Sequence, residues 1–276
     1  MSAGDASQVS LPPALVAALT PLGSVCVALS GGVDSSVVLV AATAVLGREQ
    51  VVGLTVVSPL YVAEELEDAR SLCLQLGCRH EVIPVDHFGD ERFVVNPPDR
   101  CYYCKARLCD EMMAVAGRLG CQTLLDGVNN DDLADYRPGL RAADERGVRH
   151  PLLEAGLGKA DVRALARSLG LAIWDKPANA CLASRIPYKE AITPQKLRAV
   201  AAAEAGLHAI GFRQCRVRHH GVVARVEVPL AELPRAAGEL RGRVVAAVRA
   251  AGFAYVTLDL GGLRTGSLNE VLAGER

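Results

Sequence analysis

A stretch of hydroxyl, glycine and carboxylate residues at positions 30–36 has the composition of a phosphate-binding loop. Its sequence, Ser-Gly-Gly-Val-Asp-Ser-Ser, follows an apolar run at residues 25–29 and precedes an apolar stretch at residues 37–46. This order predicts a strand, a tight glycine loop and a helix N-terminus, where backbone amides and hydroxyls donate to an anion. A carboxylate beside bound phosphates repels them unless a cation intervenes, so we expect Asp34 to bind Mg²⁺. The structural alternative is a glycine turn capped by Asp or Ser.

Cysteines lie in two segments whose neighbours suit thiol chemistry. Cys101 and Cys104 form a Cys-x-x-Cys, a spacing at which two thiols bind one metal or cluster, or form a redox disulfide. A purely structural role is an equal alternative for this pair. Cys181 lies in a polar loop at residues 175–185, where Lys176 and Arg185 would favour the nucleophilic thiolate. The alternative is a loop cysteine without function.

Arginines alternate with apolar residues near the C-terminal third of the chain. Period-two alternation places Arg216 and Arg218 on one face of a strand, and Arg225 and Glu227 on the same polar face of the next strand. Two arginines on one rigid strand suit a phosphate clamp. A solvated sheet face with an Arg–Glu pair is the alternative. The opposite face is predicted to be core and contains Cys215, Val217, Val222, Ala224, Val226 and Val228, whereas His219 and His220 are expected at an exposed turn.

The elements that position these residues alternate between strand and helix. Apolar runs predict strands at residues 25–29, 51–57, 80–85, 123–126 and 171–174, separated by helical stretches at 63–76, 103–119 and 159–169. This alternation predicts an α/β fold with a doubly wound parallel sheet. Ligands of such sheets bind at the carboxyl ends of the strands, so we expect the loops that follow to share one cleft. Residues 53–56 are expected to meet adenine through backbone groups, and Asp131 and Asp132 to form turns or caps.

Beyond residue 188 the regular alternation of strand and helix ends. A helix at 194–205, strands at 213–219 and 222–228, a mostly helical stretch at 231–251 and a strand at 254–260 predict a smaller α+β domain. We therefore divide the chain into a nucleotide-binding domain, residues 1–188, and a small domain for substrate binding or oligomerisation, residues 189–276.

Composition limits the classes of partner. The 276 residues have a formal net charge of −1 and 4% aromatic residues, which argues against a nucleic-acid-binding surface. No apolar run reaches the length of a membrane span, and the N-terminal ten residues do not resemble a signal peptide. An odd number of cysteines, nine, without an export signal predicts reduced thiols and a cytoplasmic protein. A homo-oligomer is expected.

Together these segments resemble known families. Residues 30–36 resemble the pyrophosphate loop of the ATP pyrophosphatases, which cleave ATP to AMP and pyrophosphate and adenylate a substrate. With the segments 100–105, 126–138, 181–185, 213–221 and 255–267, most of the chain is similar to the LarE family of ATP-dependent sulfur transferases. The segments Cys181–Arg185 and Cys215–Gly221 are the most specific to that family.

The resemblance implies a reaction and the residues that perform it. The substrate would be pyridinium-3,5-biscarboxylic acid mononucleotide, whose carboxylates are adenylated and converted to thiocarboxylates. The product is the precursor of the nickel-pincer cofactor of lactate racemase. The resemblance assigns Cys181 to sulfur donation, and Glu204 and Glu227 to a metal or substrate site. It assigns ATP to Ser30, Gly31, Gly32, Asp34, Ser35, Ser36 and Gly127, and the substrate to Ser184, Arg185, Arg216 and Arg218.

Two sulfur sources are compatible with the family. In the sacrificial mode Cys181 gives up its own sulfur and becomes dehydroalanine. Members with cysteines at the positions of Cys101, Cys104 and Cys181 resemble holders of a [4Fe–4S] cluster, whose free iron can bind the sulfide to be transferred. Because this chain has all three, the cluster-dependent mode is favoured. The alternatives for the whole protein are a tRNA 2-thiolation enzyme of the same superfamily and a non-catalytic nucleotide-binding module.

Overall fold

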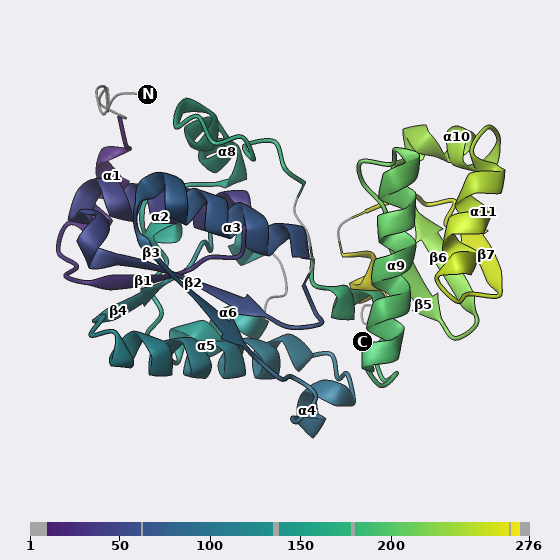
Figure 1. The fold of residues 1–276 in the computed structure, drawn as a ribbon, viewed down its shortest axis with the longest axis horizontal. Coiled ribbons are helices and arrows are strands. Elements are labelled where there is room, and N and C mark those ends of the chain that lie inside the picture. The colour runs from purple at the N-terminus through teal and green to yellow at the C-terminus, as the bar shows by residue number, and fades with distance from the viewer. Residues whose placement is uncertain (1–9, 62, 135–137, 178–179, 265, 271–276) are drawn as a thin grey trace. The chain divides into compact units, whose positions relative to one another are not determined.

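The chain forms two compact units (Figure 1). The computed structural model describes residues 10–61, 63–134, 138–177, 180–264 and 266–270. The first unit comprises Met1–Ser58, Ala63–Asp86 and Cys101–Ala178, and the second comprises Pro59–Val62, His87–Arg100 and Asn179–Arg276. Two earlier segments therefore join the C-terminal part of the chain in the second unit. The predicted division into a nucleotide-binding domain, residues 1–188, and a small domain, residues 189–276, stays a prediction.

The first unit contains the predicted parallel sheet. Its strands are β1 (Val25–Ala28), β2 (Val51–Val57), β3 (Arg79–Pro84) and β4 (Thr123–Leu125), in the order β3-β2-β1-β4. All three neighbouring pairs are parallel, with Val25 opposite both Val51 and Thr123. The β-branched runs form these strands because both faces of the sheet are covered by helices. The α/β fold class is confirmed.

The predicted fifth strand, residues 171–174, is wrong. Gly170 ends the preceding helix at a φ of +71°, and the chain then turns, with the Trp174 amide donating to the Leu171 carbonyl at 3.1 Å. Leu171 packs into the core from this turn, while the Trp174 ring is covered by the guanidinium of Arg167. The edge of β4 instead makes a single parallel bridge, between Leu125 and Arg149.

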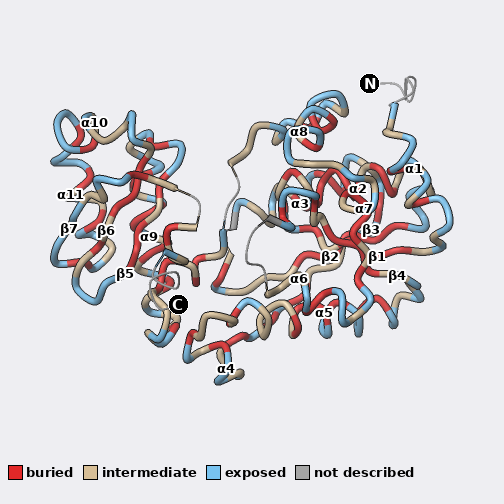
Figure 2. The backbone as a smooth tube through the Cα atoms, turned by 180° about the vertical axis from the view of Figure 1, so that it is seen from behind, coloured by how far each residue is buried: buried red, intermediate tan, exposed pale blue. Residues whose placement is uncertain are grey.

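Helices cover the two faces of this sheet. The helices of the first unit are α1 (Pro13–Leu19), α2 (Val33–Leu46), α3 (Ala63–Leu76), α5 (Arg100–Arg118), α6 (Pro138–Asp144), α7 (Pro151–Glu154) and α8 (Lys159–Ser168). One apolar cluster joins the sheet to α1, α2, α3 and α8, and a second joins it to α5 (Figures 1 and 2). Short 3₁₀ turns at Arg48–Gln50 and Asn130–Ala134 complete this unit.

The second unit is a small α+β assembly, as predicted. The helix α9 (Pro194–Ile210) packs on the antiparallel pair β5 (Arg216–His220) and β6 (Val223–Glu227), and β7 (Tyr255–Leu258) adds parallel to β6. Thr193 caps α9 by accepting from the Lys196 amide at 3.2 Å, and Gly211 ends it with a φ of +108°. The other elements are α4 (Glu91–Val94), α10 (Leu233–Ala237), α11 (Arg241–Ala250) and the 3₁₀ turns Leu182–Arg185, Leu230–Glu232 and Ser267–Asn269.

The alternation of side chains along β5 and β6 correctly predicts which residues form the core face, but it fails at the turn between the strands. Ala224, Val226 and Val228 are buried, whereas Val222 is 61% exposed because the ladder begins one residue later, at Val223. His219, expected to be exposed, is buried with its ring against Phe253.

The segments contributed from earlier in the chain are tied into the second unit by backbone-directed bonds. The buried Asn96 amide donates to the carbonyls of Ile186, Pro187 and Glu190 at 3.3, 2.7 and 3.0 Å. The Leu182 amide donates to the Leu60 carbonyl at 3.0 Å. These bonds satisfy polar groups that would otherwise be buried without partners.

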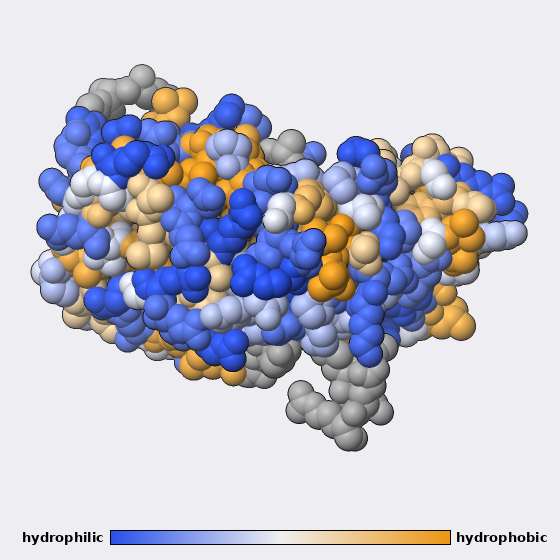
Figure 3. Space-filling model, turned by 90° about the horizontal axis from the view of Figure 1, so that it is seen from below, coloured by the Kyte–Doolittle hydropathy of each residue, from blue (hydrophilic) through white to orange (hydrophobic). Residues whose placement is uncertain are grey.

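Among the described residues, no helix is both long enough and apolar enough to cross a bilayer. On the face drawn in Figure 3, hydrophilic residues are interspersed with small apolar patches.

Candidate active site

The stretch at residues 30–36 forms the predicted turn between β1 and the N-terminus of α2. Gly31 has a φ of +72°, and a Cβ there would lie 2.1 Å from the Glu65 carbonyl oxygen. Only glycine fits both constraints. The Ser35 hydroxyl accepts from the Ser30 amide at 3.2 Å and lies 3.1 Å from the Ser30 hydroxyl, which closes the loop. Gly32 caps α2, so the first amides of that helix are available to an anion.

Gly127 lies against this loop from the end of β4. A Cβ on Gly127 would be 2.7 Å from the Ser35 amide nitrogen and 2.9 Å from the Asp34 carbonyl carbon. These neighbours are backbone atoms and cannot move aside cheaply. The structure thus brings Gly127 to the phosphate loop, where the sequence had placed it only by resemblance.

Asp34 is in an environment that favours cation binding. Burial and the Asp132 carboxylate raise its pKa above the ordinary value, while the charges of Lys159 and Arg163 act in the opposite direction. A divalent cation would neutralise this partly buried carboxylate, and oxygen ligands of this kind suit Mg²⁺. Asp34 therefore fits the predicted magnesium role, which stays a prediction. Asp132 also accepts from the Asn129 amide at 3.2 Å, in keeping with the expected turn role.

Lys176 contacts the phosphate loop, a role that the sequence did not reveal. Its ammonium donates to the Gly31 carbonyl at 3.1 Å and to the Asp68 carboxylate of α3 at 2.5 Å. The sequence connects Lys176 with Cys181 because the two are close along the chain. The observed bonds instead place its ammonium on the phosphate loop, paired with Asp68.

The Cys-x-x-Cys lies in the first turn of α5. Cys101 is exposed, Cys104 is half-buried, and neither forms a disulfide. A spacing of three residues places both thiols on one side of the helix. No group of three His, Cys, Asp or Glu side chains positioned to hold a metal occurs among the described residues. Cys101 and Cys104 belong to the first unit and Cys181 to the second, so the three-cysteine cluster and the shared cleft stay predictions.

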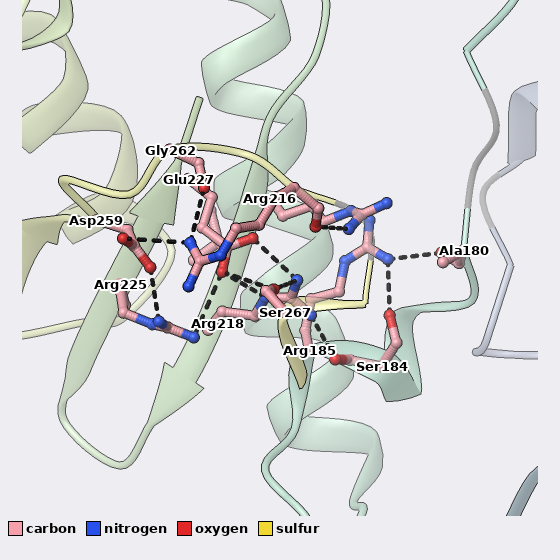
Figure 4. Close-up of polar contacts among 12 residues, drawn as sticks. Ala180, Ser184, Arg185, Arg216, Arg218, Arg225, Glu227, Asp259, Gly262 and Ser267 are labelled. Carbon is pink, nitrogen blue, oxygen red and sulfur yellow. Dashed lines mark hydrogen bonds and ion pairs between the residues drawn. The ribbon is translucent and has the colours of Figure 1, made fainter. Parts of the chain in front are cut away.

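Cys181 precedes the 3₁₀ turn Leu182–Arg185 and is half-buried. Its carbonyl accepts from the Ser184 amide at 2.9 Å and from the Arg185 guanidinium at 3.3 Å. Arg185 also donates to the Ala180 carbonyl at 2.6 Å (Figure 4), so one buried guanidinium binds the carbonyls of two successive residues.

Arg185 is held in turn by Glu204 of α9. Its Nε and Nη2 donate to the two Glu204 oxygens at 2.8 and 2.9 Å, and Glu204 also accepts from the Val217 amide at 2.8 Å. Both side chains are almost fully buried. Burial would lower the pKa of Arg185, but the Glu204 carboxylate outweighs it and raises the pKa. Both Glu204 oxygens are bonded to Arg185 in this structure, and the predicted metal or substrate role of Glu204 stays a prediction.

A second buried pair lies beside the first. Arg218 donates to both oxygens of Glu227 at 3.0 and 2.9 Å, to the Ser184 carbonyl at 2.7 Å and to the Ser267 hydroxyl at 2.7 Å (Figure 4). Glu227 is fully buried and is also 3.4 Å from Arg225. Its predicted metal or substrate role is untested, and in this structure its oxygens are bonded to arginine.

Arg216 differs from its neighbours because the only hydrogen bond found for its guanidinium among the described residues goes to the Arg264 carbonyl, at 3.2 Å. Burial and the positive charges of Arg185 and Arg218 lower its pKa. An anionic ligand would relieve this repulsion, so Arg216 fits a phosphate-binding role.

Comparison with known proteins defines the class. Residues 17–92, which contain the phosphate loop and its flanking elements, match the NAD synthase family. A protein of Synechocystis sp. described as uncharacterized is 44% identical over 247 residues, 89% of this chain and 92% of that protein. The tRNA-specific 2-thiouridylase of Azorhizobium caulinodans is 32% identical over 72% of this chain but only 60% of its own length. The fold and the loop are therefore those of an ATP pyrophosphatase with a phosphate loop.

A further relative narrows the assignment. The pyridinium-3,5-bisthiocarboxylic acid mononucleotide synthase of Lactiplantibacillus plantarum is 42% identical over 261 residues, which cover 94% of this chain and 93% of that protein. The chain belongs to the LarE family of ATP-dependent sulfur transferases. The resemblance stated from the sequence is confirmed.

Proposed function

We propose that this protein adenylates a carboxylate of pyridinium-3,5-biscarboxylic acid mononucleotide and replaces one of its oxygens with sulfur. The observation that supports this most is 42% identity, over nearly the full length, to a synthase named for the bisthiocarboxylic product. The geometry agrees with it, since one unit provides a phosphate loop and the other a buried arginine cluster beside a half-buried cysteine.

The adenylation half of the reaction uses the first unit. A substrate carboxylate oxygen attacks the α-phosphorus of ATP, and pyrophosphate leaves. The amides at the start of α2, the loop hydroxyls and the Lys176 ammonium stabilise the negative charge of the leaving pyrophosphate. Asp34 would hold Mg²⁺, and this cation would supply further charge neutralisation at the phosphates.

The sulfur-transfer half uses Cys181. In the sacrificial mode its thiolate attacks the carbonyl of the acyl adenylate, AMP leaves, and a thioester forms. Removal of the Cα proton of Cys181 then breaks the Cβ–S bond, which leaves a thiocarboxylate on the substrate and dehydroalanine in the protein. In the cluster-dependent mode Cys101, Cys104 and Cys181 would hold a [4Fe–4S] cluster with one iron open to sulfide, and Cys181 would survive turnover.

Arg216 and Arg218 are proposed to bind the substrate phosphate, with Ser184 and Arg185 at the substrate ring or carboxylate. Arg218 is already bonded to Glu227, so Arg216 is the better phosphate ligand of the two. A homo-oligomeric state and a cytoplasmic location are expected but are not needed for this mechanism.

The proposal is tested by supplying the dicarboxylate mononucleotide with MgATP and measuring pyrophosphate release and thiocarboxylate by mass spectrometry. Failure to form either product with folded protein would refute it. Intact mass before and after turnover separates the sulfur sources: loss of one sulfur at Cys181 indicates the sacrificial mode. Iron and sulfide retained after anaerobic reconstitution, with Cys181 unchanged by turnover, indicate the cluster mode.

A tRNA 2-thiolation activity is the second candidate. It is favoured by the similarity to the tRNA-specific 2-thiouridylase of Azorhizobium caulinodans. The net charge of −1 counts against it, because RNA binding needs a basic surface. Retardation of tRNA by this protein in a gel, abolished by moderate salt, would support the second candidate.

A further inference from the structure

A chain of charged side chains, centred on the buried Asp126 and His150, connects the end of β4 with α5, α6 and α7. Asp126, 4% exposed, accepts from the Lys105 ammonium at 2.8 Å and lies 2.6 Å from Nδ1 of His150. The other ring nitrogen, Nε2, lies 3.0 Å from the Asp144 carboxylate. Lys105 belongs to α5, Asp144 ends α6, and His150 caps α7. The partners of Asp126 are 21 and 24 residues away in sequence, and no local motif links them.

The geometry favours the charged form of His150. Both of its ring nitrogens face carboxylate oxygens, which in the ionised state can only accept hydrogen bonds. A neutral imidazole can donate only once, so both bonds are made only by the imidazolium. Burial alone would lower the pKa of His150, but Asp126 and Asp144 outweigh it and raise the pKa. Lys105 and His150 together hold the pKa of Asp126 well below its ordinary value although burial opposes them.

The charged network supports the phosphate loop through one turn. Asp126 is followed directly by Gly127, whose α-carbon lies so close to Asp34 and Ser35 that no Cβ fits. Asp126 fixes the direction of this turn by accepting from the Val128 amide at 3.1 Å with the same oxygen that faces His150. The bonds of Asp126 to Lys105, His150 and the Val128 amide therefore constrain the turn that packs Gly127 against Asp34 and Ser35.

We propose that His150 and Lys105 are positioning residues for ATP: by clamping Asp126 they hold the Gly127 turn against Asp34–Ser35 in the conformation that binds MgATP. This inference rests on the proposed function only in taking ATP as the ligand of the loop. The His150 imidazolium is the titratable member of the network, so nucleotide affinity depends on its protonation.

The groups that face His150 define the expected pH dependence. They are Asp126 from β4, Asp144 from α6, Glu154 from α7, whose Oε1 accepts from the His150 amide at 3.3 Å, and Lys105 across Asp126. Removing negative charge from Asp144 would make the imidazolium easier to deprotonate. Asp144 is 58% exposed, so Asp144→Asn leaves no buried group unpaired.

The test is the dissociation constant of MgATP, measured by calorimetry on the full chain without a second substrate, between about pH 6 and pH 9. We expect wild-type affinity to fall about tenfold as the imidazolium deprotonates. The glutamine of His150→Gln can donate one hydrogen bond to Asp126 but cannot be charged, so this variant should bind MgATP weakly at every pH. The pH dependence that remains in the variant measures the titration of ATP itself. In Asp144→Asn the midpoint of the pH profile should move to lower pH.

Hydrogen exchange at residues 30–36 separates a positioning role from a general effect on stability. A general loss of stability would also accelerate exchange in the neighbouring strands. Exchange at residues 30–36 should accelerate in His150→Gln, while exchange in β1 and β2 stays unchanged. His220→Gln, at an exposed position in the second unit, is the matched control and should behave as wild type. If His150→Gln does not fold, the midpoint of the pH profile of Asp144→Asn is the deciding measurement.

An unchanged midpoint in Asp144→Asn, or wild-type affinity in folded His150→Gln, would overturn the inference. A wild-type protein that shows this pH profile but makes no thiocarboxylate would overturn the proposed function and leave the inference standing. A wild-type protein that does not bind MgATP would overturn the proposed function at its first step.

Discussion

Replacing Glu204 with glutamine tests how the segment that contains Cys181 and Arg185 is held in the second unit. In the structure the two Glu204 oxygens accept from Nε and Nη2 of Arg185 at 2.8 and 2.9 Å, and both side chains are buried. Glutamine has nearly the same shape but places an amide NH₂ against a guanidinium donor. The Arg185 charge is then buried without a counter-charge, while its bonds to the Ala180 and Cys181 carbonyls still require it to stay.

The size of the effect follows from the cost of breaking a buried ion pair, about 3–5 kcal/mol. Because glutamine still accepts from the Val217 amide, we expect the lower end, about 3 kcal/mol. This corresponds to a fall in melting temperature of about 6–12 °C. Two compact units need not unfold together, so hydrogen exchange of β5 and β6 amides is the better assay, with exchange about a hundredfold faster expected.

Two further variants separate lost charge pairing from other effects. Glu232→Gln breaks the pair with Arg235, at 2.9 Å but with both side chains over a third exposed, and should cost less than about 1 kcal/mol because solvent screens it. The double variant Arg185→Met/Glu204→Met removes both buried charges and should recover most of the stability that Glu204→Gln loses, although not activity. Equal, small losses in Glu204→Gln and Glu232→Gln would refute the reasoning.

Three other substitutions have distinct expected outcomes. Gly127→Ala forces a Cβ to within 2.7 Å of the Ser35 nitrogen and should weaken MgATP binding at least about tenfold, whereas Gly117→Ala, which meets nothing within 4 Å in helix α5, should leave binding unchanged; equal affinities in calorimetry would contradict this. Lys176→Met should slow pyrophosphate release, and Lys176→Arg should recover part of the rate because the charge near the Gly31 carbonyl is kept; a Lys176→Met enzyme with wild-type pyrophosphate kinetics would show that this ammonium does not act on phosphate. Cys181→Ala should still release pyrophosphate in the presence of the mononucleotide but form no thiocarboxylate, and loss of both activities would argue against adenylation as a separate first step.

Much of the fold could be predicted because the signals are local. Strands β1 and β2 are runs of apolar and β-branched residues, and Gly77 and Gly120 end their helices at φ values of +66° and +72° as their position in the sequence suggests. The segment 171–174 misled the prediction because a short apolar run is equally compatible with a strand and with a turn packed on the core.

The site was only partly predictable, because the sequence does not show which polar side chains are buried by residues distant along the chain. Periodicity assigned Arg218 and Glu227 to one polar face, but it could not show that Ser267 and Ser184, distant in sequence, cover that face and exclude water. The sequence does contain a signal for the ion pair of Lys105 with a buried carboxylate. Lys105 shares a helical face with Cys109, Met112 and Ala116, all core residues, so a charged group at that position calls for a buried partner.

The composition of the second unit has a consequence for any attempt to dissect this protein. A fragment comprising residues 179–276 lacks Pro59–Val62 and His87–Arg100. It would lose the Leu60 carbonyl that accepts from the Leu182 amide, next to Cys181, and the Asn96 side-chain amide that donates to three carbonyls between residues 186 and 190. Because segments of the two units alternate along the chain, neither a single cut nor a circular permutation of the gene gives two contiguous, self-sufficient halves.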